Sequence, residues 1–91
     1  MTSERVWTVE IAFTEDDERT RADARLHGGG HVLAGWGRSR RNPVDRDVPL
    51  VGEELAASRA LSDLARQLVS DALDVVEVIE AERHEPHASS R

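Results

Sequence analysis

The chain has no cysteine, no lysine and no tyrosine. The absence of cysteine excludes disulfide bonds and thiolate metal sites, so a chain of 91 residues must find its stability elsewhere. No apolar run approaches the roughly 20 residues needed to span a bilayer. The N-terminus has no basic start followed by an apolar run, so no signal peptide is visible. We therefore expect a cytoplasmic protein with no membrane partner.

The residue patterns that carry catalysis are also missing. No nucleophile–base arrangement and no spaced ligand triad is recognisable from the sequence. The run Gly28-Gly29-Gly30 is followed by neither a lysine nor a helical pattern, so it does not fit a phosphate-binding loop. His27 and His31 lack a third metal ligand. We predict that the protein is not an enzyme and has no catalytic residues, no metal site, no cofactor and no small-molecule substrate.

Charge is unevenly distributed along the chain, whose net charge is −6. All 12 basic residues are arginine, and the second half is the more acidic. One locally basic patch precedes this acidic half in the sequence. It consists of Arg38, Arg40, Arg41 and Arg46, and Asp45 is the only acid between the first and the last of these arginines. Two interpretations stay open. These arginines pair with the acidic C-terminal half, or they form an edge that binds phosphate.

Apolar residues alternate with polar ones in the first half of the chain, a pattern typical of half-buried strands. It predicts strands at 5–14, 19–27 and 31–39, with Gly28-Gly29-Gly30 as a hairpin turn. Glycines inside a strand usually mark a close approach by another backbone, so we expect a helix or a partner chain over Gly35 and Gly37. The pattern leaves open which face of the third strand is core, and whether Trp36 is a core or an interface residue.

After the proline-containing linker the apolar residues recur at helical spacing, which predicts a helix at 53–69. Ser70-Asp71 is a candidate break and helix N-cap. The segment 72–80 is ambiguous because its valines favour a strand while its spacing fits a helix; we predict a second helix at 71–83. The expected fold is therefore α+β, a three-stranded antiparallel sheet followed by two helices (β-β-β-α-α). It would form one domain at 1–83, with a disordered tail at 84–91.

Several motifs also resemble a known family. They are Trp7-Thr8-Val9, Gly35-x-Gly37, Arg41-Asn42-Pro43, Asp45-Arg46, Val48-Pro49, Gly52 and Ala60-Leu61-Ser62-Asp63-Leu64. Over about residues 5–83 the chain resembles a family of small actinobacterial proteins of unknown function with a fold like the double-stranded-RNA-binding domain. A dormancy-associated member of it has been compared with ribosome hibernation-promoting factors. The resemblance implies a dimer with a sheet backed by helices.

We consider two functions. The first is a stress- or dormancy-associated factor that binds RNA or the ribosome through Arg38, Arg40, Arg41 and Arg46. The second is a dimeric protein-interaction or regulatory module that binds no nucleic acid. In both we expect a homodimer, because three strands leave two edges and one small sheet cannot cover all the apolar residues of the helical half. The candidate dimer contacts are Trp36, Val75, Val76 and Ile79.

Overall fold

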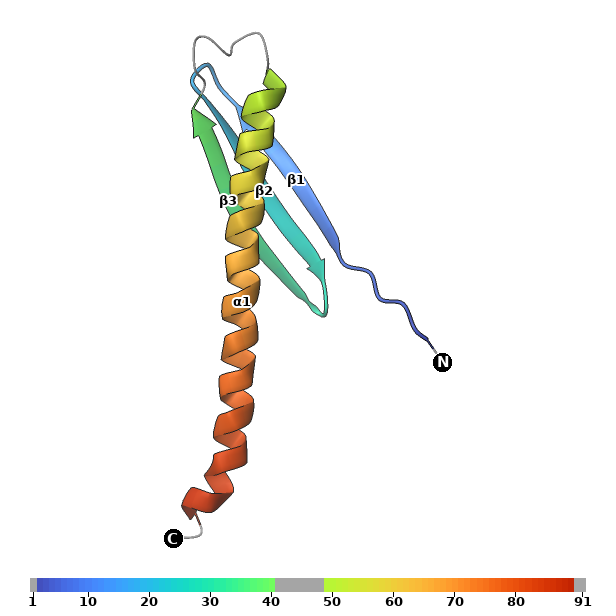
Figure 1. Ribbon diagram of the computed structural model, residues 1–91, viewed down its shortest axis with the longest axis vertical. Coiled ribbons are helices and arrows are strands. Elements are labelled where there is room, and N and C mark those ends of the chain that lie inside the picture. Colours follow the sequence, from blue (N-terminus) through green and yellow to red (C-terminus); the bar gives the residue numbers. More distant parts are fainter. Residues whose placement is uncertain (1, 41–48, 90–91) are drawn as a thin grey trace.

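The structure is a computed structural model that describes the backbone of residues 2–40 and 49–89, and the side chains as far as Arg83. Three strands precede one helix: β1 (Thr8–Glu15), β2 (Arg19–Gly28), β3 (His31–Arg40) and α1 (Pro49–Ser89) (Figure 1). The strands form one antiparallel sheet in the order β1-β2-β3. The three predicted strands are confirmed, with the start of the first moved by three residues.

The predicted pair of helices is wrong, because α1 runs without interruption from Pro49 to Ser89. Proline is tolerated at the first position of a helix, where its missing N–H would have had no partner. Ser70 and Asp71 lie inside α1 and do not break it. Each costs only a few tenths of a kcal/mol in a helix interior, which is too little to stop a helix that is favoured on both sides. The fold is therefore β-β-β-α.

Two short turns fix the register of the sheet. Between β1 and β2, the Asp16 carboxylate accepts hydrogen bonds from the backbone N–H groups of Glu18 and Arg19, at 2.8 and 2.7 Å. Between β2 and β3, Gly29 and Gly30 have φ angles of +61° and +82°. Positive φ at both central residues is what the commonest two-residue hairpin turn requires, and glycine adopts it without strain. The predicted glycine turn is confirmed.

The core lies between one face of the sheet and α1, which packs over β2 and β3. Its buried apolar residues are Ala22, Ala24, Leu26, Ala56, Ala60 and Leu64. Most are alanine, so helix and sheet come very close together. A Cβ added at Gly35 would meet the backbone of Leu64, and one added at Gly37 would meet the backbone of Ala60. The expected close approach over these two glycines is confirmed, and its partner is the helix.

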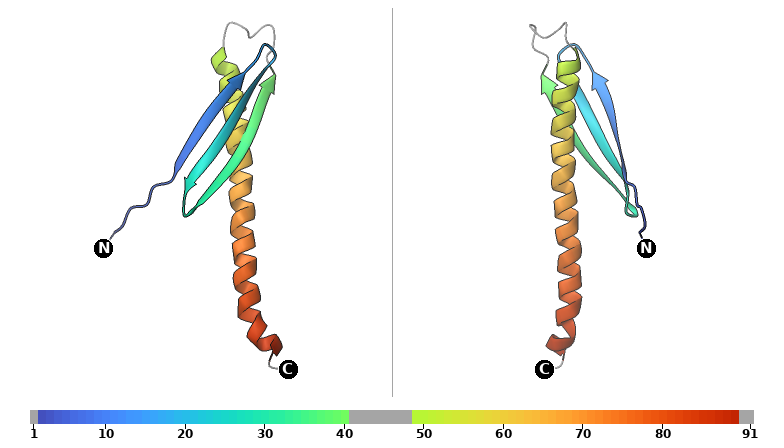
Figure 2. Two further views of the ribbon diagram at one scale, coloured as in Figure 1. Left: turned by 180° about the vertical axis from the view of Figure 1, so that it is seen from behind. Right: turned by 45° about the vertical axis from the view of Figure 1, so that its right-hand side comes forward.

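The helix is much longer than the sheet that it covers. In Figure 1 and both views of Figure 2, α1 crosses the sheet with its first half and then continues well beyond the β2–β3 turn. The molecule is correspondingly elongated, with extents of 68 × 37 × 15 Å. We call residues 72–83 the distal half of α1. No stretch of α1 within the described residues is apolar enough to cross a bilayer. The division of the chain at residue 83 stays a prediction.

Candidate nucleic-acid interface

The sheet face opposite α1 carries no helix, as the view from behind shows (Figure 2, left), and we call it the open face. Its side chains alternate with the buried ones along β2 and β3, because successive residues of a strand point to opposite sides. The pairing of Asp23 with Ala12 on one side and with Trp36 on the other aligns the three strands on this face.

The open face is basic in an acidic protein. Five of its side chains are arginines: Arg19, Arg21, Arg25, Arg38 and Arg40. Its described carboxylates are Glu10 and Asp23, so its formal charge is +3 while that of the whole chain is −6. Asp23 forms an ion pair with Arg21 at 3.0 Å. The hydrogen bonds from Arg21 to Asp23 raise the pKa of Arg21 above its ordinary value, so this guanidinium is charged throughout the physiological range.

Trp36 lies near the middle of these arginines, and 47 % of its surface is exposed. The guanidinium carbon of Arg21 is 4.5 Å from the centre of the Trp36 ring, and that of Arg38 is 5.9 Å from it. Both distances are within the range of cation–π attraction. The two guanidinium groups therefore lie over a Trp36 ring that is still about half exposed. A flat aromatic group next to fixed positive charges is the arrangement on which nucleic-acid bases stack while their phosphates are neutralised.

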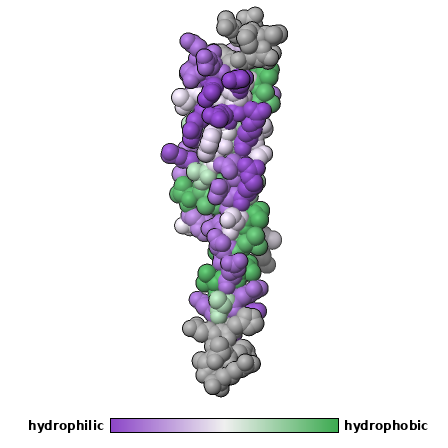
Figure 3. Space-filling model, turned by 90° about the vertical axis from the view of Figure 1, so that its left-hand side faces the viewer, coloured by the Kyte–Doolittle hydropathy of each residue, from purple (hydrophilic) through white to green (hydrophobic). Residues whose placement is uncertain are grey.

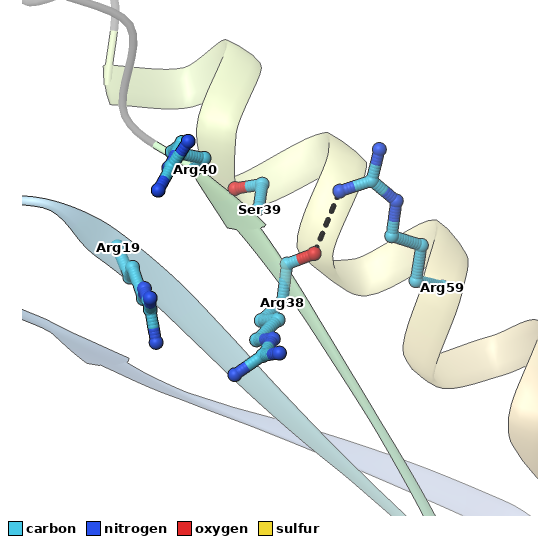
Figure 4. A pocket seen from close by; sticks show the side chains of 5 residues that line it. All are labelled: Arg19, Arg38, Ser39, Arg40 and Arg59. Atoms are coloured by element: carbon cyan, nitrogen blue, oxygen red, sulfur yellow. Dashed lines mark hydrogen bonds between the residues drawn. The ribbon is translucent and has the colours of Figure 1, made fainter.

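Two hollows border this arrangement. The first, of about 260 Å³, is lined by Thr14, Asp16, Arg19, Arg21, Trp36 and Arg38. The second, of about 290 Å³, is lined among the described residues by Arg19, Arg38, Ser39, Arg40 and Arg59 (Figure 4). The arginines of β2 and β3 at this hollow favour an anionic ligand, because a guanidinium group can donate two parallel hydrogen bonds to a phosphate or carboxylate.

Side chains of α1 hold the outer edge of β3 in place. Arg59 donates a hydrogen bond to the carbonyl oxygen of Arg38 at 2.6 Å, and the Asp63 carboxylate accepts one from the backbone N–H of Trp36 at 3.0 Å. Near the end of β3, the Ser39 hydroxyl donates to the carbonyl oxygen of Gly52 at 2.8 Å. These contacts fix the backbone from which Trp36 and Arg38 project, so the helix behind the sheet positions the side chains in front of it.

The residues proposed from the sequence are only partly brought together. Arg38 and Arg40 lie on the open face, whereas Arg41 and Arg46 fall outside the described residues. Trp36, which the sequence left open between core and interface, is an exposed residue of the open face. The other candidate dimer contacts, Val75, Val76 and Ile79, are exposed on the distal half of α1, away from Trp36.

Sequence reasoning missed the contribution of β2. Arg19, Arg21 and Arg25 stand on the open face because they alternate with the buried Ala22 and Ala24. The alternation was visible in the sequence, but only the pairing of Arg21 with Arg38 and of Arg19 with Arg40 shows that the two strands form one basic surface. The register between β2 and β3, which a short hairpin turn fixes, was the signal from which this basic surface could have been predicted.

Comparisons with known proteins support the fold and leave the activity unassigned. A family model described as Rv2632c-like matches residues 5–87. An uncharacterised protein of Mycobacterium tuberculosis, Rv2632c, is 47 % identical over 78 residues, covering 86 % of this chain and 81 % of its own. An uncharacterised protein of Mycobacterium bovis, Mb1767, is 44 % identical over 80 residues, covering 88 % and 82 %. The crystal structure of Rv2632c is 40 % identical and superposes with a TM-score of 0.76, covering 85 % of this chain and 92 % of that one.

Proposed function

We propose that this protein, which belongs to the Rv2632c-like family, binds RNA through the open face of its sheet. The observation that carries the proposal is the half-exposed Trp36 with the guanidinium groups of Arg21 and Arg38 over its ring, among further arginines of β2 and β3. The relatives are uncharacterised, so the proposal rests on the chemistry of this face.

Single-stranded RNA is the nucleic acid that this surface fits best. A sheet face with an exposed aromatic residue offers a base a flat surface to stack on, which is how several RNA-binding sheets work. A paired base inside a duplex cannot stack on a protein side chain unless it is first extruded. The arginines around the ring would meet the phosphates on either side of the stacked base.

The overall charge of −6 does not exclude such binding. Exposed charges more than about 8 Å apart are largely screened at physiological ionic strength, so a ligand at the open face responds mainly to the local charge. The acidic distal half of α1 extends away from the sheet (Figure 1). It would oppose approach of RNA along the helix and thereby favour approach from the open face.

A more specific form of the proposal is a stress- or dormancy-associated factor that binds the ribosome. Ribosomal RNA exposes single-stranded loops, which are the elements that proteins recognise by base stacking. The ribosomal role therefore needs RNA binding by the open face, but RNA binding does not need the ribosomal role. The two levels can be tested one after the other.

The first test measures the affinity for a fluorescent oligouridine as salt is raised. For single strands, the logarithm of the binding constant falls with the logarithm of salt concentration with a slope of about −0.7 for each neutralised phosphate. The double variant Arg38→Glu, Arg40→Glu should make this slope shallower by about 1.4 if each arginine meets one phosphate. It should also weaken binding at low salt by at least tenfold.

The matched control is Arg5→Glu, Arg83→Glu, which changes the net charge by the same amount on exposed positions outside the open face. It should bind oligouridine with an unchanged salt slope. If both double variants lose affinity equally, the effect is one of net charge and the open face is not the site. If the unmodified protein shows no salt-dependent binding at low salt, RNA binding itself is refuted.

Ribosome binding is then measured by co-sedimentation at several salt concentrations. Binding that is lost in Arg38→Glu, Arg40→Glu and kept in the control would support the ribosomal role. Oligouridine binding without co-sedimentation would remove the ribosomal role and leave the RNA proposal intact.

The alternative is a dimeric protein-interaction or regulatory module that binds no nucleic acid. One observation favours it: the apolar side chains along the distal half of α1 are about half exposed. It is the function that would remain if neither oligouridine nor ribosomes bind.

A further inference from the structure

We infer that the open face prefers a nucleotide that carries a 5′-diphosphate or 5′-triphosphate, with its base at Trp36 and its phosphates in the hollow drawn in Figure 4. We call this hollow the arginine hollow. Two sources offer this chemistry, the unprocessed 5′ end of an RNA and a free nucleotide. The inference rests on the proposed function, because it uses the same face, and it adds a preference for one end of the strand.

The arginines of the open face are gathered mainly on one side of Trp36. In the next row of paired residues on this face, Arg21 of β2 stands opposite Arg38 of β3. In the row after it, at the end of β3, Arg19 stands opposite Arg40. These four arginines carry a formal charge of +4. An anion is therefore attracted to this end of the face.

Most of these arginines have no counter-ion within the described residues. Arg21 is paired with Asp23. No ion pair within residues 2–40 and 49–83 involves Arg19, Arg38 or Arg40. Like charges directly opposite each other on neighbouring strands destabilise a sheet. The two arginine rows therefore cost stability unless an anion lies between them, which points to an anionic ligand.

The side of Trp36 away from the arginine hollow carries no net charge. Its nearer row pairs Arg25 of β2 with Glu10 of β1 and with Ala34 of β3. Its farther row consists of Thr8, His27 and Val32. Figure 3, which views the molecule from the β3 side, shows hydrophilic side chains gathered over the upper half of the sheet and an apolar cluster below them. The open face is therefore basic at one end only.

This one-sided charge fits a nucleotide with a terminal polyphosphate. Inside an RNA strand every base has one phosphate on each side, so an internal segment would leave the surplus of arginines on one side only partly matched. A terminal nucleotide with two or three phosphates concentrates its negative charge on one side of its base. Complementary charge patterns of this kind favour one ligand over another.

The distance from Trp36 to the arginine hollow also fits such a ligand. Residues two apart in a strand are separated by roughly 6.8 Å, so the row of Arg19 and Arg40 lies on the order of 14 Å from Trp36 along the sheet. A single phosphate next to a base at Trp36 would reach the nearer row, that of Arg21 and Arg38. A chain of two or three phosphates extends towards the farther row.

The arginine hollow is the better of the two hollows for phosphate. Figure 4 shows the side chains of Arg19, Arg38 and Arg40 around it. Arg19 and Arg38 also line the hollow beside Trp36, so the two hollows adjoin. The Asp16 carboxylate lines only the hollow beside Trp36, where it opposes a phosphate. Among the described residues that line the arginine hollow there is no carboxylate.

The first experiment compares three oligouridines that differ only in the 5′ end, which is a hydroxyl, a monophosphate or a triphosphate. A fluorescent label at the 3′ end reports binding without divalent cations. The triphosphate should bind about tenfold more tightly than the hydroxyl, because further phosphates add charge-assisted hydrogen bonds and release counterions. Equal affinity for the three ends would overturn the inference and leave RNA binding intact. No binding of any oligouridine would refute RNA binding, and this inference with it.

Variants then locate the preference. The double variant Arg19→Gln, Arg40→Gln should bring the affinities for the triphosphate and the hydroxyl close together. The matched control Arg5→Gln, Arg25→Gln removes the same charge before β1 and on the other side of Trp36, and it should keep the preference. Each variant is compared with itself, so a general loss of affinity does not change the ratio. A preference kept in the first variant, or lost equally in both, would overturn the inference.

The second experiment separates the two sources by competition against the labelled triphosphate RNA. Displacement by UTP at concentrations near the Kd of that RNA would identify the free nucleotide as the ligand. Displacement only at much higher concentrations would identify the RNA end. Inorganic triphosphate is the control for the base. If it competes as well as UTP, the base contributes nothing and its placement at Trp36 is refuted.

Discussion

Replacing Gly35 with alanine is a sensitive test of the close packing between α1 and β3. In a strand with no element packed over it, replacing glycine with alanine raises the free energy of unfolding by roughly 0.5–1 kcal/mol, because glycine loses more conformational freedom on folding. Here the added methyl group would lie 2.8 Å from the carbonyl oxygen of Ala60 and 2.9 Å from the Cα of Leu64. These atoms belong to the helix backbone, which cannot turn aside as a flexible side chain can.

The helix must therefore move outward, which reduces its contacts along β2 and β3. Overpacking of a core typically costs about 1–3 kcal/mol. Subtracting the gain in strand propensity leaves a net loss of about 1–2 kcal/mol for Gly35→Ala. At the usual urea dependence of about 1–3 kcal/mol per molar for small proteins, the unfolding midpoint should fall by roughly 0.5–1 M.

Urea unfolding followed by circular dichroism measures this shift, at one fixed protein concentration because oligomers unfold in a concentration-dependent way. The control is Ala34→Gly on the open face, which should lose only about 0.5–1 kcal/mol through strand propensity. The sign of the change in the free energy of unfolding caused by Gly35→Ala decides the outcome. If Gly35→Ala is as stable as the unmodified protein, or more stable, the helix does not lie this close to β3.

Three further predictions follow from the same structure. Trp36→Ala should weaken oligouridine binding by about 1–3 kcal/mol through lost stacking; an unchanged affinity would show that bases do not stack there. Leu64→Ala, which removes a large buried side chain, should lower the free energy of unfolding by about 2–5 kcal/mol, and a loss below half a kcal/mol in a urea titration would contradict its place in the core. Gly30→Ala, at a φ of +82° with open space around it, should cost about 1–2 kcal/mol from backbone strain alone; a neutral effect in a thermal melt would argue against the two-residue turn.

The sheet could be predicted from the sequence because the patterns that indicate it lie within single strands and their turns. Alternation in β2, from Thr20 to Leu26, follows directly from having one face buried. The pair Gly35 and Gly37 predicted a close backbone neighbour, since no other residue fits there. The sequence did not tell which element would approach, because that depends on the path of the chain after residue 40.

The single long helix and the full basic face were not predictable in the same way. At Ser70-Asp71 a cap-like dipeptide suggested a break, but cap preferences matter only where a helix end is already favoured. The helical spacing of the apolar residues in 72–80 then suggested a second helix after that break. The basic face was seen only in part, because Arg38 and Arg40 are neighbours in sequence while Arg19 and Arg21 join them through strand pairing.

The hydrogen bonds from α1 to the edge of β3 have a consequence for aggregation. An exposed strand edge can add a strand from another molecule, which is how many sheets begin to form fibrils. At Trp36 the outward N–H is occupied by Asp63, and at Arg38 the outward carbonyl is occupied by Arg59. A foreign strand would have to displace both side chains before it could pair with β3. Edge-to-edge growth of this three-stranded sheet should therefore begin at β1.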